Sequence, residues 1–165
     1  MNLQLRTGSE ASTIRAGREL AAALRGGVII ALEGPLGAGK TCLARGIAIG
    51  LGVEARRVAS PTFAILHEHE VEGVGEVRRL YHLDAYRLGG AEDLESIGWT
   101  EIVGDQTGVV LIEWASRIAE ALPAGAWRMD VSYDDSTGRL LQLQLPVGVE
   151  LDMPWGETED SATGG

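Results

Sequence analysis

The octapeptide GPLGAGKT at residues 34–41 constrains this chain more than any other segment. It fits the pattern G-x-x-x-x-G-K-[ST] of a phosphate-binding loop, which works only between a buried strand and the start of a helix. Both flanks agree with that context. Residues 28–32 (VIIAL) have the apolar, β-branched composition of a parallel strand, and an apolar helical stripe follows the loop until Gly52. The sequence therefore predicts a strand, a phosphate loop and a helix, in that order.

Lys40 is the only lysine among the 14 Lys and Arg side chains. A compact ammonium on a flexible stem reaches between the phosphates of a tight loop, where a planar guanidinium fits poorly. Thr41 stands where its hydroxyl can bind Mg²⁺. We expect the loop and the first helical turn to hold the nucleotide, through Leu36, Gly37, Ala38, Gly39, Lys40, Thr41 and Cys42.

Two acidic side chains end apolar strands. Glu113 closes the run 109–112 (VVLI), and Asp84 closes the run 80–83 (LYHL). A phosphate loop needs such an acid beside it to complete the Mg²⁺ shell. The residues alone leave open which of the two lies near the metal and which lies near the attacking water.

Residues 60–62 (Ser-Pro-Thr) have two interpretations. They form either an ordinary turn or a sensor of the γ-phosphate. Pro61 restricts the residue before it, and the Thr62 hydroxyl would join the Mg²⁺ shell only when a γ-phosphate is present.

The nucleotide base is expected to be adenine. A guanine-reading Asn-Lys-x-Asp motif is impossible, because the only asparagine is Asn2. Residues 105–108 (DQTG) match the D-x-x-G of GTPases, but they precede a strand instead of following one, so we interpret them as a turn.

The remaining segments alternate between strands and helices. A capping box at residues 7–10, with Thr7 as the cap, predicts a helix that runs to about Leu24. The other expected elements are a strand at 79–84, a helix at 91–97, a strand at 109–113, a helix at 115–122 and a hairpin of residues 127–133 and 139–145.

Composition and charge limit the class of protein. The 165 residues predict one domain over residues 1–145, and the net charge of −10 argues against a direct grip on nucleic acid. Residues 146–165 are acidic and Gly- and Pro-dotted, so we expect a disordered tail. The single cysteine, the lack of a leader-like N-terminus and the lack of an apolar run of about 18 residues predict a cytoplasmic protein with no membrane partner.

Four segments together resemble one known family: residues 36–41 (LGAGKT), 60–63 (SPTF), 82–88 (HLDAYRL) and 111–114 (LIEW). Their order and spacing are similar to those of the TsaE (YjeE) family of bacterial ATPases, over residues 7–145. The resemblance implies an α/β P-loop NTPase domain of three α/β/α layers with a mixed central sheet. It also implies a protein that binds ATP and Mg²⁺, associates with the TsaD–TsaB pair and hydrolyses ATP to support repeated turnover. That pair forms threonylcarbamoyladenosine next to the anticodon, so tRNA would be met only through the complex.

The same resemblance implies roles for individual residues. Lys40 and the loop amides bind phosphates, and Thr41 and Glu113 hold Mg²⁺. Asp84 positions a metal-bound or attacking water, which also makes it a candidate metal contact. Thr62 is the switch threonine and completes the candidate catalytic set of Lys40, Thr62, Asp84 and Glu113.

The resemblance places the adenine between the first helix and the late hairpin, near Glu10 and Arg139. The chain departs from the family at Pro35, where Asp is common, and at Cys42, where a second Thr is common. Neither position is expected to act mainly through its side chain, so we expect nucleotide binding to survive. Residues 115–116 (Ala-Ser) replace the usual Pro-Glu, which leaves the start of the next helix open.

Two other functions remain open. A small-molecule kinase would need an arginine-rich lid, and the sequence contains no recognisable one. A nucleotide sensor that binds without hydrolysis would keep its ATP-dependent partner binding after replacement of Asp84 and Glu113.

Overall fold

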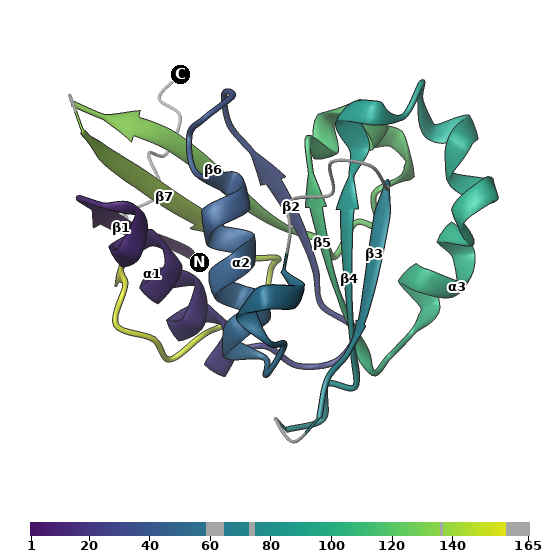
Figure 1. Ribbon diagram of the computed structural model, residues 1–165, viewed down its shortest axis with the longest axis horizontal. Coiled ribbons are helices and arrows are strands. Elements are labelled where there is room, and N and C mark those ends of the chain that lie inside the picture. The colour runs from purple at the N-terminus through teal and green to yellow at the C-terminus, as the bar shows by residue number, and fades with distance from the viewer. Residues whose placement is uncertain (59–64, 73–74, 136, 158–165) are drawn as a thin grey trace.

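The computed structural model describes residues 1–58, 65–72, 75–135 and 137–157. In this part of the chain eight strands form one sheet with the order β3-β4-β5-β2-β6-β7-β1-β8 (Figure 1). The strands are β1 Asn2–Thr7, β2 Ile29–Glu33, β3 Leu66–Glu70, β4 Arg79–Asp84, β5 Gly108–Glu113, β6 Trp127–Asp134, β7 Gly138–Gln144 and β8 Gly156–Glu157.

The centre of the sheet is parallel and its two sides are antiparallel. β4, β5, β2 and β6 are parallel neighbours. β3 pairs antiparallel with β4, and β7, β1 and β8 continue antiparallel beyond β6. The predicted mixed sheet is therefore confirmed. Because the four parallel strands end at one edge, the residues that follow β2, β4 and β5 gather there, where open α/β sheets bind ligands.

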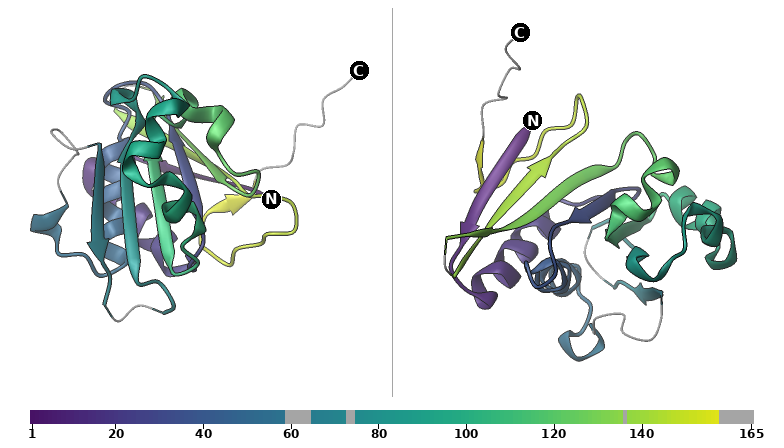
Figure 2. Two further views of the ribbon diagram at one scale, coloured as in Figure 1. Left: turned by 90° about the vertical axis from the view of Figure 1, so that its right-hand side faces the viewer. Right: turned by 90° about the horizontal axis from the view of Figure 1, so that it is seen from above.

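Helical segments cover both faces of the sheet. They are α1 Glu10–Ala22, α2 Lys40–Gly50, α3 Trp99–Gly104 and the 3₁₀ segments η1 Ala55–Arg57, η2 Ala85–Arg87, η3 Ala91–Ile97 and η4 Ala115–Ala121. Along β2, Ile30 and Leu32 point into the core beneath α1 and α2, whereas Ile29 and Ala31 point into the core beneath the other helices. Figure 2 shows the two helical layers, which confirm the predicted α/β/α arrangement. No helix in the described ranges is long and apolar enough to cross a membrane.

The two helices on one face approach closely through glycines. A Cβ atom added to Gly46 in α2 would lie 2.1 Å from the Ile14 carbonyl oxygen, and one added to Gly17 in α1 would lie 2.5 Å from the Leu43 carbonyl oxygen. These contacts leave no room for a side chain. The close crossing fixes the position of α2, the helix that follows the phosphate loop, against α1.

The start of α1 differs from the prediction. Ser9 is the N-cap: its hydroxyl accepts from Ser12 N at 3.1 Å, and Ser12 Oγ accepts from Ser9 N at 2.9 Å. Thr7 instead ends β1, and its hydroxyl lies 2.7 Å from Thr13 Oγ1. The expected box at residues 7–10 is therefore wrong, because pairing with β7 carries the strand through Thr7.

Helix types on the opposite face also differ from expectation. Residues 91–97 have the predicted bounds but form a 3₁₀ helix. The helix expected at 115–122 is a 3₁₀ segment with a kink at Ile118, where φ is −126°. α3 is an additional element, and it begins after Gly98 in a left-handed conformation, φ 75°.

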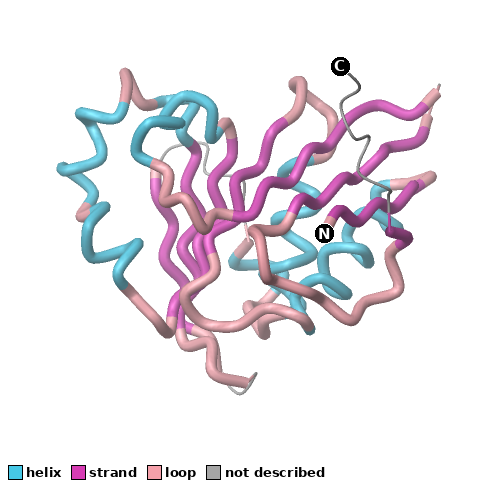
Figure 3. The backbone as a smooth tube through the Cα atoms, turned by 180° about the vertical axis from the view of Figure 1, so that it is seen from behind, coloured by secondary structure: helices cyan, strands magenta, loops and turns pink. Residues whose placement is uncertain are grey.

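After β7 the chain turns back over the domain, as Figure 3 shows from behind. Trp155 is only 4% exposed, and its indole N–H donates to Glu19 of α1 at 3.4 Å. Val149, Leu151 and Met153 pack against the same core, and β8 adds a strand at the edge of β1. The expectation of disorder is therefore wrong for residues 146–157, because alternating apolar side chains meet a surface built from distant segments. Residues 158–165 lie outside the described part.

Candidate nucleotide-binding site

The loop between β2 and α2 has the glycine-dependent geometry that its sequence predicts. Gly34, Gly37 and Gly39 have φ values of 144°, 76° and 105°, which L side chains rarely adopt. A Cβ atom at Gly34 would lie 2.1 Å from the carbonyl oxygen of Val131 in β6. The glycines therefore let the loop curl tightly against the neighbouring strand.

The N-terminus of α2 is open to an anion. α1 is closed by the Ser9–Ser12 capping box, whereas no described side chain caps α2 at Gly39. The first amides of a helix lack intrahelical partners, and the helix dipole adds partial positive charge there. The start of α2 at Lys40 is thus suited to phosphate oxygens.

Lys40 is folded over the loop. Its ammonium donates to the carbonyls of Gly34 at 2.6 Å and Pro35 at 2.9 Å, and it lies 4.0 Å from the ring centroid of Trp114. Burial lowers the pKa of Lys40, and the carboxylates at the ends of β5, β2 and β4 oppose that shift. The only lysine of the chain is therefore held at the loop, with polar partners that phosphate oxygens can replace.

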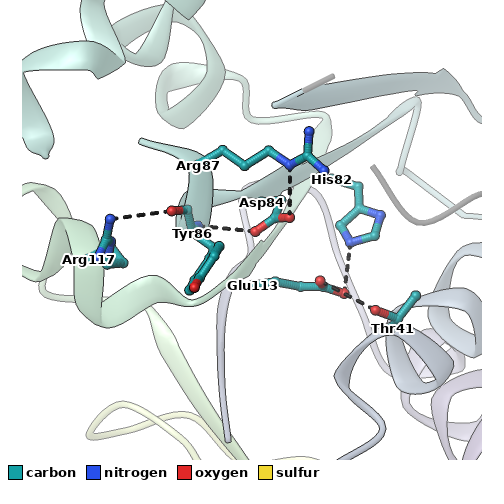
Figure 4. Close-up of polar contacts among 7 residues, drawn as sticks. All are labelled: Thr41, His82, Asp84, Tyr86, Arg87, Glu113 and Arg117. Atoms are coloured by element: carbon teal, nitrogen blue, oxygen red, sulfur yellow. Dashed lines mark hydrogen bonds and ion pairs between the residues drawn. The ribbon is translucent and has the colours of Figure 1, made fainter. Parts of the chain in front are cut away.

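The two predicted acids lie side by side. Asp84 and Glu113 are partners in the register of the parallel strands β4 and β5. Glu113 is 4% exposed, and its Oε2 accepts from Thr41 Oγ1 at 3.4 Å (Figure 4). The fold thus brings together three residues predicted from separate segments. A threonine hydroxyl and a carboxylate are the hard oxygen donors that Mg²⁺ prefers, so the donor set fits that ion.

Asp84 has a different setting from Glu113. Its Oδ1 accepts from Tyr86 N at 3.1 Å, and its Oδ2 lies 3.9 Å from Arg87 Nε. Burial raises the pKa of Asp84, the Tyr86 amide opposes that shift, and the negative charge of Glu113 adds to it. A carboxylate with a raised pKa beside this candidate metal-binding pair is chemically suited to hold a water molecule or accept its proton.

Sequence reasoning missed two polar residues of this edge. His82 Nε2 lies 3.3 Å from Glu113 Oε1, and both side chains are buried. Glu33, at the end of β2, accepts from Ser116 N and from Ser116 Oγ at 3.3 Å, which holds the turn into η4. The signal for His82 was its place two residues before Asp84, since residues i and i+2 of a strand share a face.

Trp114 links the loop lysine to the segment after β4. It has a left-handed backbone, φ 58°, and η4 begins directly after it without the family's Pro-Glu. Its ring lies 5.1 Å from that of Tyr86, whose carbonyl accepts from Arg117 at 3.3 Å. Arg117 also donates to the Leu88 carbonyl at 3.1 Å.

The late hairpin meets the loop from the other side. Tyr133 Oη donates to the Leu36 carbonyl at 3.0 Å, and Arg139 donates to the Gly37 carbonyl at 3.4 Å. The Arg139 guanidinium lies 4.5 Å from the Tyr133 ring centroid. Arg139 thus borders the loop, and its contact with the adenine stays a prediction.

Glu10 and Cys42 are neighbours near that hairpin. Burial raises the pKa of the Cys42 thiol, and the charge and hydrogen bond of Glu10 add to the shift. The first residue of α1 therefore lies close to the first turn of α2, and the adenine contact of Glu10 stays a prediction. Thr62 lies outside the described residues, so its role remains a prediction.

Comparison with known proteins agrees with this geometry. Residues 7–141 match the family model of the threonylcarbamoyl adenosine biosynthesis protein TsaE. The tRNA threonylcarbamoyladenosine biosynthesis protein TsaE of Treponema pallidum is 42% identical over 115 residues, which cover 70% of this chain and 80% of that protein. The Bacillus subtilis protein of the same name is 42% identical over 121 residues, 73% of this chain and 72% of that protein.

A solved structure is similar along almost the whole chain. The crystal structure of Bacillus subtilis YdiB aligns with a TM-score of 0.68 and 31% sequence identity, over 88% of this chain and 86% of that one. The fold, the phosphate loop and these matches agree with each other. This chain belongs to the TsaE family, the P-loop nucleotide-binding proteins of tRNA threonylcarbamoyladenosine biosynthesis.

Proposed function

We propose that this protein binds ATP with Mg²⁺ and hydrolyses it slowly, in association with a TsaD–TsaB-type pair that modifies the adenosine next to the tRNA anticodon. The observation that carries the proposal is the meeting of Thr41, Glu113 and Asp84 beside the loop lysine. Family membership supports the pathway. The protein would act in the cytoplasm.

The phosphates are bound by Lys40 and by the amides of the loop and the first turn of α2. On binding, the ammonium exchanges the carbonyls of Gly34 and Pro35 for phosphate oxygens. Thr41 and Glu113 hold the metal, and Mg²⁺ when bound neutralises charge on the phosphate oxygens. Asp84 orients the attacking water and accepts its proton, for which its raised pKa is favourable.

The isolated protein is expected to be slow, because its described arginines near the acids already have partners. Arg87 lies against Asp84, and Arg117 is held by the carbonyls of Tyr86 and Leu88. An arginine on the transferred phosphoryl group accelerates related reactions by about 10³–10⁵. Binding of the partners would rearrange the segment that contains Tyr86, Arg87 and Leu88, and would also position the switch residue Thr62. Both changes would raise the rate of ATP hydrolysis.

The protein meets tRNA through its partners. The net charge of −10 opposes direct contact with a phosphate backbone. Arg139 borders the loop and Glu10 lies beside Cys42 of α2, and we propose that the adenine lies near these two residues.

The test is ATP hydrolysis with and without purified TsaD–TsaB, by the wild type, Lys40→Ala and Glu113→Ala. Glu120→Ala is the matched control, because Glu120 is an exposed glutamate of η4. We expect stimulation by the partners, loss of at least about 100-fold in both site variants and no change in the control. Partner binding that requires ATP without hydrolysis in any sample would favour the sensor. No response to the partners would lead to a phosphoryl-acceptor screen for a kinase.

A further inference from the structure

The function proposed above uses Glu113 but assigns no role to His82 or to its contact with Glu113. The two side chains come from neighbouring strands, β4 and β5, and are 3% and 5% exposed. His82 Nε2 lies 3.3 Å from Glu113 Oε1 (Figure 4). Burying two polar groups costs free energy unless they form a hydrogen bond with each other. We therefore ask what this buried contact does for the site.

The proposed metal site assigns a direction to the contact. A carboxylate binds a metal in its ionised form, which has no proton to donate, so in that site Glu113 accepts and the Nε2 atom of His82 carries the hydrogen. His82 thus occupies Oε1, while Oε2 faces the Thr41 hydroxyl at 3.4 Å. Within the described residues, these are the two hydrogen-bond partners of the Glu113 carboxylate.

The fold explains why a histidine suits this position. His82 and Asp84 lie on the same face of β4, and Glu113 lies on that face of β5, where α2 packs. A glutamate has three side-chain torsions, so its carboxylate can occupy several places at a strand end. The imidazole ring is rigid and buried, and it restrains one carboxylate oxygen while the other faces Thr41.

We propose that His82 is a positioning residue that holds Glu113 with Oε2 toward the Thr41 hydroxyl, in the arrangement in which these two residues would hold the metal. This inference rests on the proposed Mg²⁺–ATP site. It assigns to His82 the outer-shell role of orienting a metal ligand, and loss of such a partner typically lowers metal affinity by about 10–100-fold.

The test measures metal affinity directly. Mn²⁺ is titrated into the protein with a saturating non-hydrolysable ATP analogue, and free Mn²⁺ is followed by electron paramagnetic resonance. His82→Leu keeps the bulk and removes the donor, and it should weaken Mn²⁺ binding by about 10–100-fold. His82→Gln keeps a donor at similar reach and should restore most of the affinity. His69→Leu is the matched control, because His69 is a buried histidine of β3 whose ring contacts His67 and not Glu113.

A second experiment asks whether His82 acts through Glu113. In a Glu113→Gln background, His82→Leu should cause little further loss of Mn²⁺ affinity, since the oriented ligand is already gone. An equal loss in both backgrounds, or an unchanged affinity in His82→Leu, would overturn the inference. If circular dichroism shows that His82→Leu does not fold, His82→Asn replaces it. Its shorter amide keeps a buried polar group but does not reach Glu113, and the same loss is expected.

The two proposals fail separately. A wild type that binds Mn²⁺ and nucleotide normally but never hydrolyses ATP, even with its partners, removes the proposed hydrolysis and leaves the role of His82 intact. If the wild type hydrolyses ATP and His82→Leu retains full Mn²⁺ affinity, the proposed role of His82 is wrong and the proposed hydrolysis stands.

Discussion

Replacement of Trp155 by alanine tests whether the segment after β7 belongs to the core. A buried tryptophan removes about 200 Å² from water, which at about 25 cal/mol per Å² corresponds to about 5 kcal/mol. The unfolded chain already buries part of that surface, which lowers the estimate to about 3–4 kcal/mol. Trp155 is 4% exposed, so almost the whole side chain counts. The loss is also limited by the free energy with which residues 146–157 dock.

The assay is urea unfolding followed by circular dichroism, because the substitution removes a fluorophore. With a slope of about 2 kcal/mol per M, the midpoint of Trp155→Ala should fall by about 1.5–2 M urea. Val147→Ala is the control, since Val147 lies in the same segment and is fully exposed. Its midpoint should not move, because exposed substitutions change stability by less than about 0.5 kcal/mol. Equal midpoints for both variants and the wild type would refute the packing argument.

Three further predictions follow from the site and its supporting helices. Burial, with a neighbouring carboxylate, raises the pKa of Asp84, so the folded state binds this proton more tightly than the unfolded state and ionised Asp84 destabilises the fold. Asp84→Asn should therefore increase the free energy of unfolding at pH 7. The gain should shrink as pH falls from the pKa of Asp84 in the folded state to its lower pKa in the unfolded state. Urea unfolding measures the gain, and a gain that does not change with pH would contradict this reasoning. ATP should change tryptophan emission as Lys40 leaves the ring of Trp114, and Trp114→Phe should lose most of that change; a full response from the variant would show that the reporter is another tryptophan. Gly46→Ala should destabilise the protein by about 2 kcal/mol or more in thermal unfolding, because the added Cβ would lie 2.1 Å from the Ile14 carbonyl oxygen. Gly104→Ala is the control. Its Cβ would meet open space, so the substitution should be neutral or stabilising by up to about 1 kcal/mol.

Features with short-range causes could be predicted from the sequence. The phosphate loop and its flanking strand and helix follow from spacing within about 25 residues, and β4 at Arg79–Asp84 has the predicted bounds. The acids Glu113 and Asp84 were found because each ends an apolar strand, and in a parallel sheet such ends meet. The family resemblance added Glu10 and Arg139, whose contacts with the adenine stay predictions.

Features that depend on partners far away in the sequence could not be predicted from the sequence. Nothing local distinguishes Thr7 from Ser9 as a helix cap, and pairing between β1 and β7 decided it. The sequence shows His82 as one residue of an apolar strand, and only the fold brings its ring to the carboxylate of Glu113 in β5, 31 positions later. Trp155 has its hydrogen-bond partner 136 positions earlier in α1.

The sequence by itself identified the nucleotide-binding loop, because its glycines, its lysine and its threonine stand at fixed spacings within eight residues. Only the tertiary structure decided which oxygen of Glu113 faces Thr41, which histidine holds the other oxygen, and where the acidic C-terminal segment packs. The physical reason is that backbone conformation and side-chain spacing act between neighbours along the chain. The orientation of a buried carboxylate and the docking of an apolar segment depend on strand register and surface shape, which form only when remote segments meet.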